Sequence, residues 1–198
     1  MIGQLRGQVI DKQPPHILID VNGVGYDVQV TMNTCCSLEL HSEATLLTHL
    51  SIRDDAHVLY GFISPIERHV FRILIKVSGV GPKLALTLLS GMNANELITC
   101  VQQQDTARLT QVPGIGKKTA ERLIIETRDT LSQLANTTLA PQAGTAHNMT
   151  DDALSALISL GYKPNEAKQA IQHQQANATS TETLIRLALQ YLMTGVTS

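Results

Sequence analysis

Residues 1–63 alternate apolar and polar side chains in short runs, a pattern that is typical of β-strands. The runs are QLRGQVI, HILIDV, YDVQV, ATLLTHLSI and HVLYGF. Asn22-Gly23 and Gly25 mark a tight connection between the second and the third run. Five short strands in one small stretch predict a closed antiparallel barrel, because closure removes exposed sheet edges.

From Pro65 onward the apolar period becomes helical. Phe71, Leu74 and Ile75, for example, fall on one face of a helix. We therefore expect residues 64–134 to form a helical domain.

The last part of the chain begins with a stretch that lacks any period. Residues 135–149 carry few large apolar side chains, which predicts a flexible linker. Residues 150–198 then show the pattern of a three-helix bundle. The residues expected to open its helices are Thr150 or Asp151, Pro164, and Ser180 or Thr181.

The helical domain contains an internal repeat. VSGVGPKLALTLLS begins at Val77, and VPGIGKKTAERLII begins 35 residues later at Val112. Each copy is typical of two helices joined by a glycine hairpin. The glycines permit positive φ and allow a foreign backbone to approach closely. The apolar residue between them, Val80 or Ile115, is expected to point inward as an anchor.

The second helix of each copy begins with free N–H groups, which form an anion site. Lys83, Lys117 and Lys118 lie in these first turns, where the helix dipole disfavours a cation by about 0.3–1 kcal/mol. A bound phosphate would convert this cost into attraction. The alternative is a pair of ordinary packing units with solvated lysines. The predicted DNA contacts are Gly79, Val80, Gly81, Lys83, Gly114, Ile115, Gly116, Lys117, Lys118 and Thr119.

The distribution of charge along the chain bears on whether it can bind nucleic acid. The formal net charge of −2 seems unsuited to a nucleic-acid partner. Yet residues 64–134, which hold the repeat, carry a net charge of +3, and local charge decides binding. The chain has no tryptophan and few aromatics, which disfavours stacking of single strands. Three cysteines without metal spacing and no membrane-length apolar run favour a soluble cytoplasmic protein.

Six stretches spread over all three parts carry a resemblance to the RuvA family of Holliday-junction-binding subunits. They are MIGQLRG, VNGVGYDV, RDDAHVLYGF, GVGPKLAL, PGIGKKTAERLI and LGYKP. The resemblance implies an α+β fold: an N-terminal five-stranded barrel of the oligonucleotide-binding (OB) type, a tandem helix-hairpin-helix domain, and a mobile C-terminal three-helix bundle.

The same resemblance implies a function. It is sequence-independent recognition of four-way DNA junctions, together with loading and stimulation of a separate hexameric ATPase, RuvB, for branch migration in recombination and repair. The junction resolvase RuvC is then expected in the same pathway. A homotetramer is implied, with a face-to-face octamer left open, and no cofactor or metal is expected. Four subunits suit four DNA arms.

Two further groups of residues gain a role from the resemblance. Without the resemblance, Asp54-Asp55 indicates only a solvated hairpin tip. In RuvA the matching acids form a pin at the point where the DNA strands cross. Family members often carry Glu before the Asp, so the first acid is shorter here, and Arg53 offsets part of the charge. The expected docking patch for RuvB consists of Leu157, Leu160, Tyr162, Leu187 and Tyr191.

Catalysis has little support in the sequence. His41, His49 and His57 recur every eight residues, which is neither helical nor metal-ligand spacing. No possible nucleophile lies at a sequence spacing from a general base that would indicate a catalytic pair. Two alternatives to a non-catalytic subunit remain: a structure-selective nuclease with magnesium on the paired aspartates, and a generic DNA-tethering adaptor.

Overall fold

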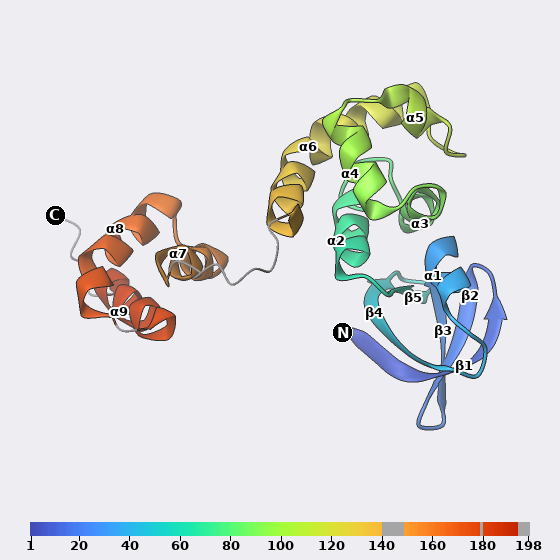
Figure 1. The fold of residues 1–198 in the computed structure, drawn as a ribbon, viewed down its shortest axis with the longest axis horizontal. Helices are drawn as coiled ribbons and strands as arrows, with labels where there is room; N and C mark the ends of the chain where they lie inside the picture. Colours follow the sequence, from blue (N-terminus) through green and yellow to red (C-terminus); the bar gives the residue numbers. More distant parts are fainter. Residues whose placement is uncertain (140–148, 179, 194–198) are drawn as a thin grey trace. The chain divides into compact units, whose positions relative to one another are not determined.

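The computed structural model describes residues 1–139, 149–178 and 180–193, without the side chains of 135–139 and 176. The chain divides into two compact units, Met1–Ala140 and Pro141–Ser198 (Figure 1). Among the described residues no single helix is long and apolar enough to cross a membrane. Of the helices in the described ranges, one pair, Pro82–Gly91 and Ala94–Gln102, meets the length and composition test when taken together, across a bend of 95°.

The first unit begins with the expected five-stranded barrel, and all five apolar runs form strands. The strands are β1 (Gln4–Gln13), β2 (His16–Val21), β3 (Val24–Val30), β4 (Glu43–Ile52) and β5 (His57–Phe62). The barrel closes in the order β1-β2-β3-β5-β4, with β4 pairing back to β1. Asn22 and Gly23 have φ angles of 53° and 87°, which is the backbone of a tight hairpin turn between β2 and β3.

One pairing in the barrel differs from the expectation of a purely antiparallel sheet. Strands β3 and β5 are parallel, because the chain crosses the barrel through a helix and β4 before β5 returns beside β3. That helix, α1 (Met32–Ser37), was not predicted. The Thr31 hydroxyl caps it by accepting a hydrogen bond from the Thr34 amide at 3.2 Å.

The helical domain follows directly from β5. Its helices are α2 (Pro65–Leu74), α3 (Pro82–Gly91), α4 (Ala94–Gln102), α5 (Thr106–Thr110) and α6 (Lys117–Leu139). Proline occupies the first turn of α2 and of α3, where its missing N–H costs nothing. Asn93 and Glu96 form a reciprocal capping box at the start of α4.

The barrel has a hydrophobic core of its own, and strand β5 also contributes Tyr60 and Phe62 to the core of the helical domain. Phe71 of α2 packs against Tyr60 and Phe62 of β5, with ring centroids 5.1 and 4.9 Å apart. The Thr31 hydroxyl also donates a hydrogen bond of 2.7 Å to Glu67 of α2. Burial raises the pKa of Glu67, and the hydrogen bonds from the threonine hydroxyls act in the opposite direction. This packing anchors α2, which leads into the first hairpin, against the barrel.

Helix α6 corrects the predicted linker. It continues to Leu139, so residues 135–139 are helical rather than part of a linker. A helix that has formed extends at little cost, because each further residue adds one hydrogen bond. Residues 140–148 of the predicted linker lie outside the described residues, and Met149 already belongs to the next helix.

The second unit has the three expected helices. They are α7 (Met149–Ser159), α8 (Pro164–Gln174) and α9 (Thr181–Met193), with a 3-10 turn at Gln175–Asn177 after α8. Ser180 caps α9 by accepting a hydrogen bond from the Thr183 amide at 3.2 Å. Because α7 begins at Met149, Thr150 and Asp151 lie inside its first turn and do not cap it, contrary to expectation.

Candidate nucleic-acid interface

The two hairpins of the repeat have the same backbone geometry. In the first, Gly79 has a φ of 87°, and the Val80 amide donates to the Val77 carbonyl at 3.0 Å. In the second, Gly114 has a φ of 90°, and an equivalent bond of 3.1 Å joins Ile115 to the Val112 carbonyl. The left-handed backbone explains why both positions are glycine.

The residue between the two glycines of each hairpin is an anchor. Val80 and Ile115 are 4% and 5% exposed, and they pack into the hydrophobic core of the domain. Their amides are already used within the turns. Neither residue therefore offers a side chain or an N–H group to DNA, and these two predicted contacts are corrected to structural anchors.

Among the described residues, the first N–H groups of the helices that follow the hairpins have no hydrogen-bond partner. In α3 the first intrahelical bond runs from the Ala85 amide to the Gly81 carbonyl, which leaves the amides of Lys83 and Leu84 free. Pro82 has no N–H to offer. Gly81 supplies no side-chain cap. An anion site at a helix N-terminus requires such unbonded amides, and the start of α3 supplies two of them.

Helix α6 repeats this arrangement with one more donor. Its first intrahelical bond, from Ala120 to the Gly116 carbonyl, leaves the amides of Lys117, Lys118 and Thr119 free. Non-proline Lys117 takes the place that Pro82 has in the first copy. The second anion site therefore has three free amides where the first has two.

The three lysines of the hairpins lie where the sequence analysis placed them. Lys83, Lys117 and Lys118 occupy first helical turns and are exposed to solvent. Within the described part of the chain, no ion pair involves them. Their charges add to the partial positive charge of the helix ends, which makes the electrostatic potential at both helix starts positive.

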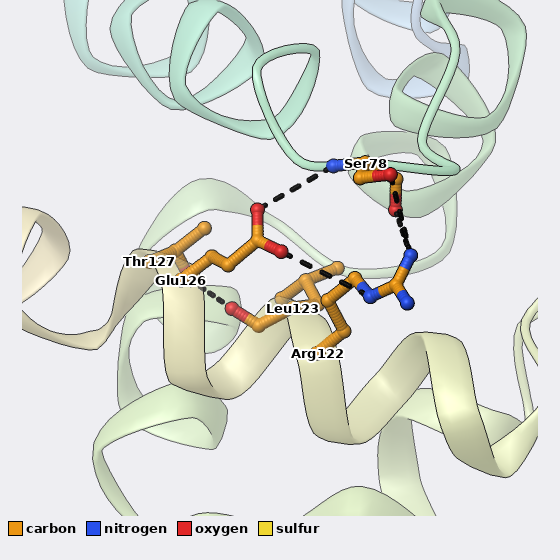
Figure 2. Close-up of polar contacts among 5 residues, drawn as sticks. All are labelled: Ser78, Arg122, Leu123, Glu126 and Thr127. Atoms are coloured by element: carbon orange, nitrogen blue, oxygen red, sulfur yellow. Dashed lines mark hydrogen bonds and ion pairs between the residues drawn. The ribbon is translucent and has the colours of Figure 1, made fainter.

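A polar contact connects the first hairpin to the second motif (Figure 2). The Ser78 amide donates to Glu126 Oε2 at 3.4 Å. Arg122 Nη1 donates to the Ser78 carbonyl and to Ser78 Oγ, each at 3.3 Å. Arg122 and Glu126 face each other on α6, with Nε 3.9 Å from Oε1. Neither residue was predicted as part of the site, although their four-residue spacing on a helix indicates an ion pair.

The paired aspartates lie at the tip between β4 and β5. The tip is closed by hydrogen bonds between Arg53 and Ala56, of 2.9 and 3.4 Å. Asp54, Asp55 and Arg53 are exposed, and no ion pair within the described residues neutralises them. This geometry presents two exposed carboxylates on one turn, next to Arg53 but without an ion pair to it.

The histidines do not form a metal site or a catalytic group in the described part of the chain. His49 packs edge-on against Phe71, with ring centroids 5.5 Å apart, and burial, followed by nearby Arg72, lowers its pKa. Across the ranges that the structure describes, no group of three or more His, Cys, Asp or Glu side chains is placed to hold a metal ion.

The predicted docking patch on the second unit needs one correction. Leu157 is fully buried in the core of the bundle, because it lies on the face of α7 that packs against the other two helices. Leu160 is 61% exposed, and Tyr162 and Leu187 are partly exposed. The ring of Tyr191 stacks on His173, with centroids 5.0 Å apart. Ile158, which was not in the predicted patch, is 42% exposed.

Comparison with protein families identifies each part of the chain. A model described as the RuvA N-terminal domain matches residues 1–61. A model of the SAM-like helix-hairpin-helix tandem matches residues 71–129, and the RuvA C-terminal domain matches residues 148–193.

Curated relatives match over the full length. A protein of Coxiella burnetii (strain RSA 493 / Nine Mile phase I) is 51% identical over 98% of this chain and 100% of its own length. Relatives from Shewanella denitrificans and Pseudomonas aeruginosa (strain LESB58) are 48% and 50% identical, covering 98% and 96% of this chain and 100% and 98% of their own lengths. All three are named Holliday junction branch migration complex subunit RuvA. The chain therefore belongs to the RuvA family.

Proposed function

We propose that this chain recognises four-way DNA junctions without reading their base sequence. The observation that carries the proposal is the pair of matched hairpins, each with free amides at a helix start and unpaired lysines beside them. Such sites bind phosphates, which position a protein on DNA but carry no sequence information. The names of the relatives, which refer to the Holliday junction, support the same substrate.

The exposed acids at Asp54 and Asp55 supply the selectivity in this proposal. In a homotetramer, four tips would meet at the centre, where the strands of a junction cross. Carboxylates repel phosphates there, and the repulsion is largest for a continuous duplex that must run straight across the centre. A junction can open at the same point. The hairpins then provide affinity, and the tip provides discrimination.

The motor is assigned to a partner. A branch-migration complex, the assembly named for the relatives, needs an ATPase, and we propose that a RuvB-type hexamer fills this role in the cytoplasm. Exposed Ile158 and Leu160, with the partly exposed Tyr162, Leu187 and Tyr191, are the proposed docking patch. RuvC would act later on the same junction.

The test of junction recognition compares a four-way junction with a duplex of the same arm sequence in a gel shift. Stronger binding to the junction is expected, because only the junction satisfies all hairpins while opening at the acidic tip. Equal affinity for the two DNAs would favour the generic tethering adaptor. Incubation of the junction with magnesium and no ATP completes the test: intact DNA is expected, and cleavage products would instead identify a nuclease.

The role of the second unit is tested by ending the chain after residue 139, which keeps all of α6. The first unit retains both hairpins, so junction affinity should be unchanged, while RuvB-driven branch migration should be lost. A Leu160→Asp variant of the full chain provides the matched point change. Migration by the shortened chain at the wild-type rate would show that the docking assignment is wrong.

A further inference from the structure

The contact that holds Ser78 comes from the other copy of the repeat. Arg122 and Glu126 lie in α6, the helix whose first turn presents Lys117 and Lys118. Together they bind the amide, the carbonyl and the hydroxyl of Ser78 (Figure 2). The helix that forms the second phosphate site thus also holds the loop of the first. We call Arg122 and Glu126 the Ser78 clamp.

Among the described residues, no side chains hold the second hairpin in the same way. A shift of 35 residues, the spacing of the repeat, places Pro113 opposite Ser78, Thr87 opposite Arg122 and Gly91 opposite Glu126. Neither Thr87 nor Gly91 can form an ion pair. Proline has a fixed φ and no N–H that needs a partner. The second loop is therefore stiffened by its own sequence.

The two hairpins also differ in how closely other side chains pack against their glycines. A Cβ atom added to Gly114 would lie 3.1 Å from Leu84 Cδ1, so the second loop is packed against α3. A Cβ atom added to Gly79 would meet nothing within 4 Å. The Gly79 side of the first loop is therefore open, and the polar contacts of Ser78 take the place of that packing.

We propose that Glu126, together with Arg122, is a positioning residue that fixes the first hairpin relative to the second. The two phosphate sites would then be presented at a set spacing before DNA arrives. Such preorganisation increases affinity, because the loop need not be ordered on binding. The proposal rests on the proposed function, since it concerns DNA phosphates.

The sign of one substitution separates positioning from simple electrostatics. Glu126 is an acid beside a phosphate-binding loop, so by charge alone its removal should strengthen DNA binding. Positioning predicts the opposite: Glu126→Ala should weaken junction affinity roughly three- to tenfold for each subunit that contacts the junction, the effect of one lost hydrogen bond per subunit. Glu121→Ala is the matched control, because Glu121 is an exposed acid on the same helix with no ion pair among the described residues. It should bind as well as wild type or more tightly.

Two further variants show how Glu126 acts. Glu126→Gln keeps an oxygen that can accept the Ser78 amide proton, so it should restore most of the affinity. Placed in a Lys83→Ala background, Glu126→Ala should have little further effect, because the first hairpin is already impaired. In a Lys118→Ala background its effect should persist in full.

The outcomes distinguish the possible failures. Affinity of Glu126→Ala equal to or above that of Glu121→Ala overturns the positioning role. An equal loss in both lysine backgrounds also overturns it, because the effect then does not pass through the first hairpin. Failure of Glu126→Gln to restore affinity overturns it as well, because the bond to the Ser78 amide is then not the cause of the loss. If Lys83→Ala and Lys118→Ala both bind the junction like wild type, the proposed function itself is wrong, and the positioning role falls with it.

Discussion

The two hairpins share one backbone geometry but reach it by different means. The second is stiffened by Pro113, packed against Leu84, and followed by three free amides and two lysines. The first has two free amides and one lysine, and its loop depends on side chains of the other motif. Similar sequence repeats can therefore form one turn and still differ in strength and in what supports them.

The comparison predicts that the second hairpin contributes more to DNA affinity. Each phosphate contact contributes about −0.9 to the slope of log K against log salt. In a homotetramer, Lys83→Ala should make the slope shallower by up to about 3–4 units, and Lys117→Ala/Lys118→Ala by up to about 7. Salt titrations with junction DNA measure both slopes.

The control for this prediction is Lys168→Ala, which removes an exposed lysine from α8 in the second unit. It should leave the slope unchanged. Equal slope changes for the two hairpins would show that the additional lysine and amide of the second are not used, and no change for either would place DNA elsewhere.

Glycine substitutions compare the two hairpins by their contribution to the free energy of unfolding. Gly79→Ala and Gly114→Ala should each lower the free energy of unfolding by about 1–2 kcal/mol, because alanine is strained at positive φ. Gly114→Ala should be the more destabilising, since its new methyl group would lie 3.1 Å from Leu84 Cδ1. Urea unfolding midpoints test this order. A larger loss for Gly79→Ala would mean that the first loop is the more tightly packed one, contrary to the structure.

The smallest expected effect concerns neither hairpin. Replacing Asp54 and Asp55 by asparagine keeps size and turn propensity but removes the charges of the tip. Duplex affinity should rise more than junction affinity, and the difference should shrink at high salt as screening increases. Parallel titrations of both DNAs measure the ratio. A ratio identical to that of wild type would make the tip a solvated turn without a role in selectivity.

Local patterns predicted those elements whose stability is local. The five strands followed from alternation, and both glycine hairpins followed from the repeat, since a positive φ leaves a direct mark on the sequence. The parallel pairing of β3 with β5 could not be predicted, because it depends on where the chain returns after α1 and β4. Helix α1 was missed for a related reason: six residues are too few to establish a period.

The charged residues of the candidate site could be predicted from the sequence, but the contacts between its side chains could not. The lysines and the glycines were identified from spacing alone. The clamp was not, because Ser78 and Glu126 lie 48 residues apart and meet only through packing. Leu157 was predicted as part of a docking surface but is buried, because an apolar stripe in the sequence does not show which of its residues the other helices will cover.

The most direct test of sequence-independent junction recognition uses two four-way junctions with unrelated arm sequences and one matched duplex. Affinity is measured for each across a range of salt concentrations. We predict that the two junctions follow the same steep line, because phosphates are contacted and bases are not, and that the duplex binds more weakly throughout. A difference between the junctions of about tenfold or more, the effect of a single base contact, would contradict the account, as would equal affinity for the duplex.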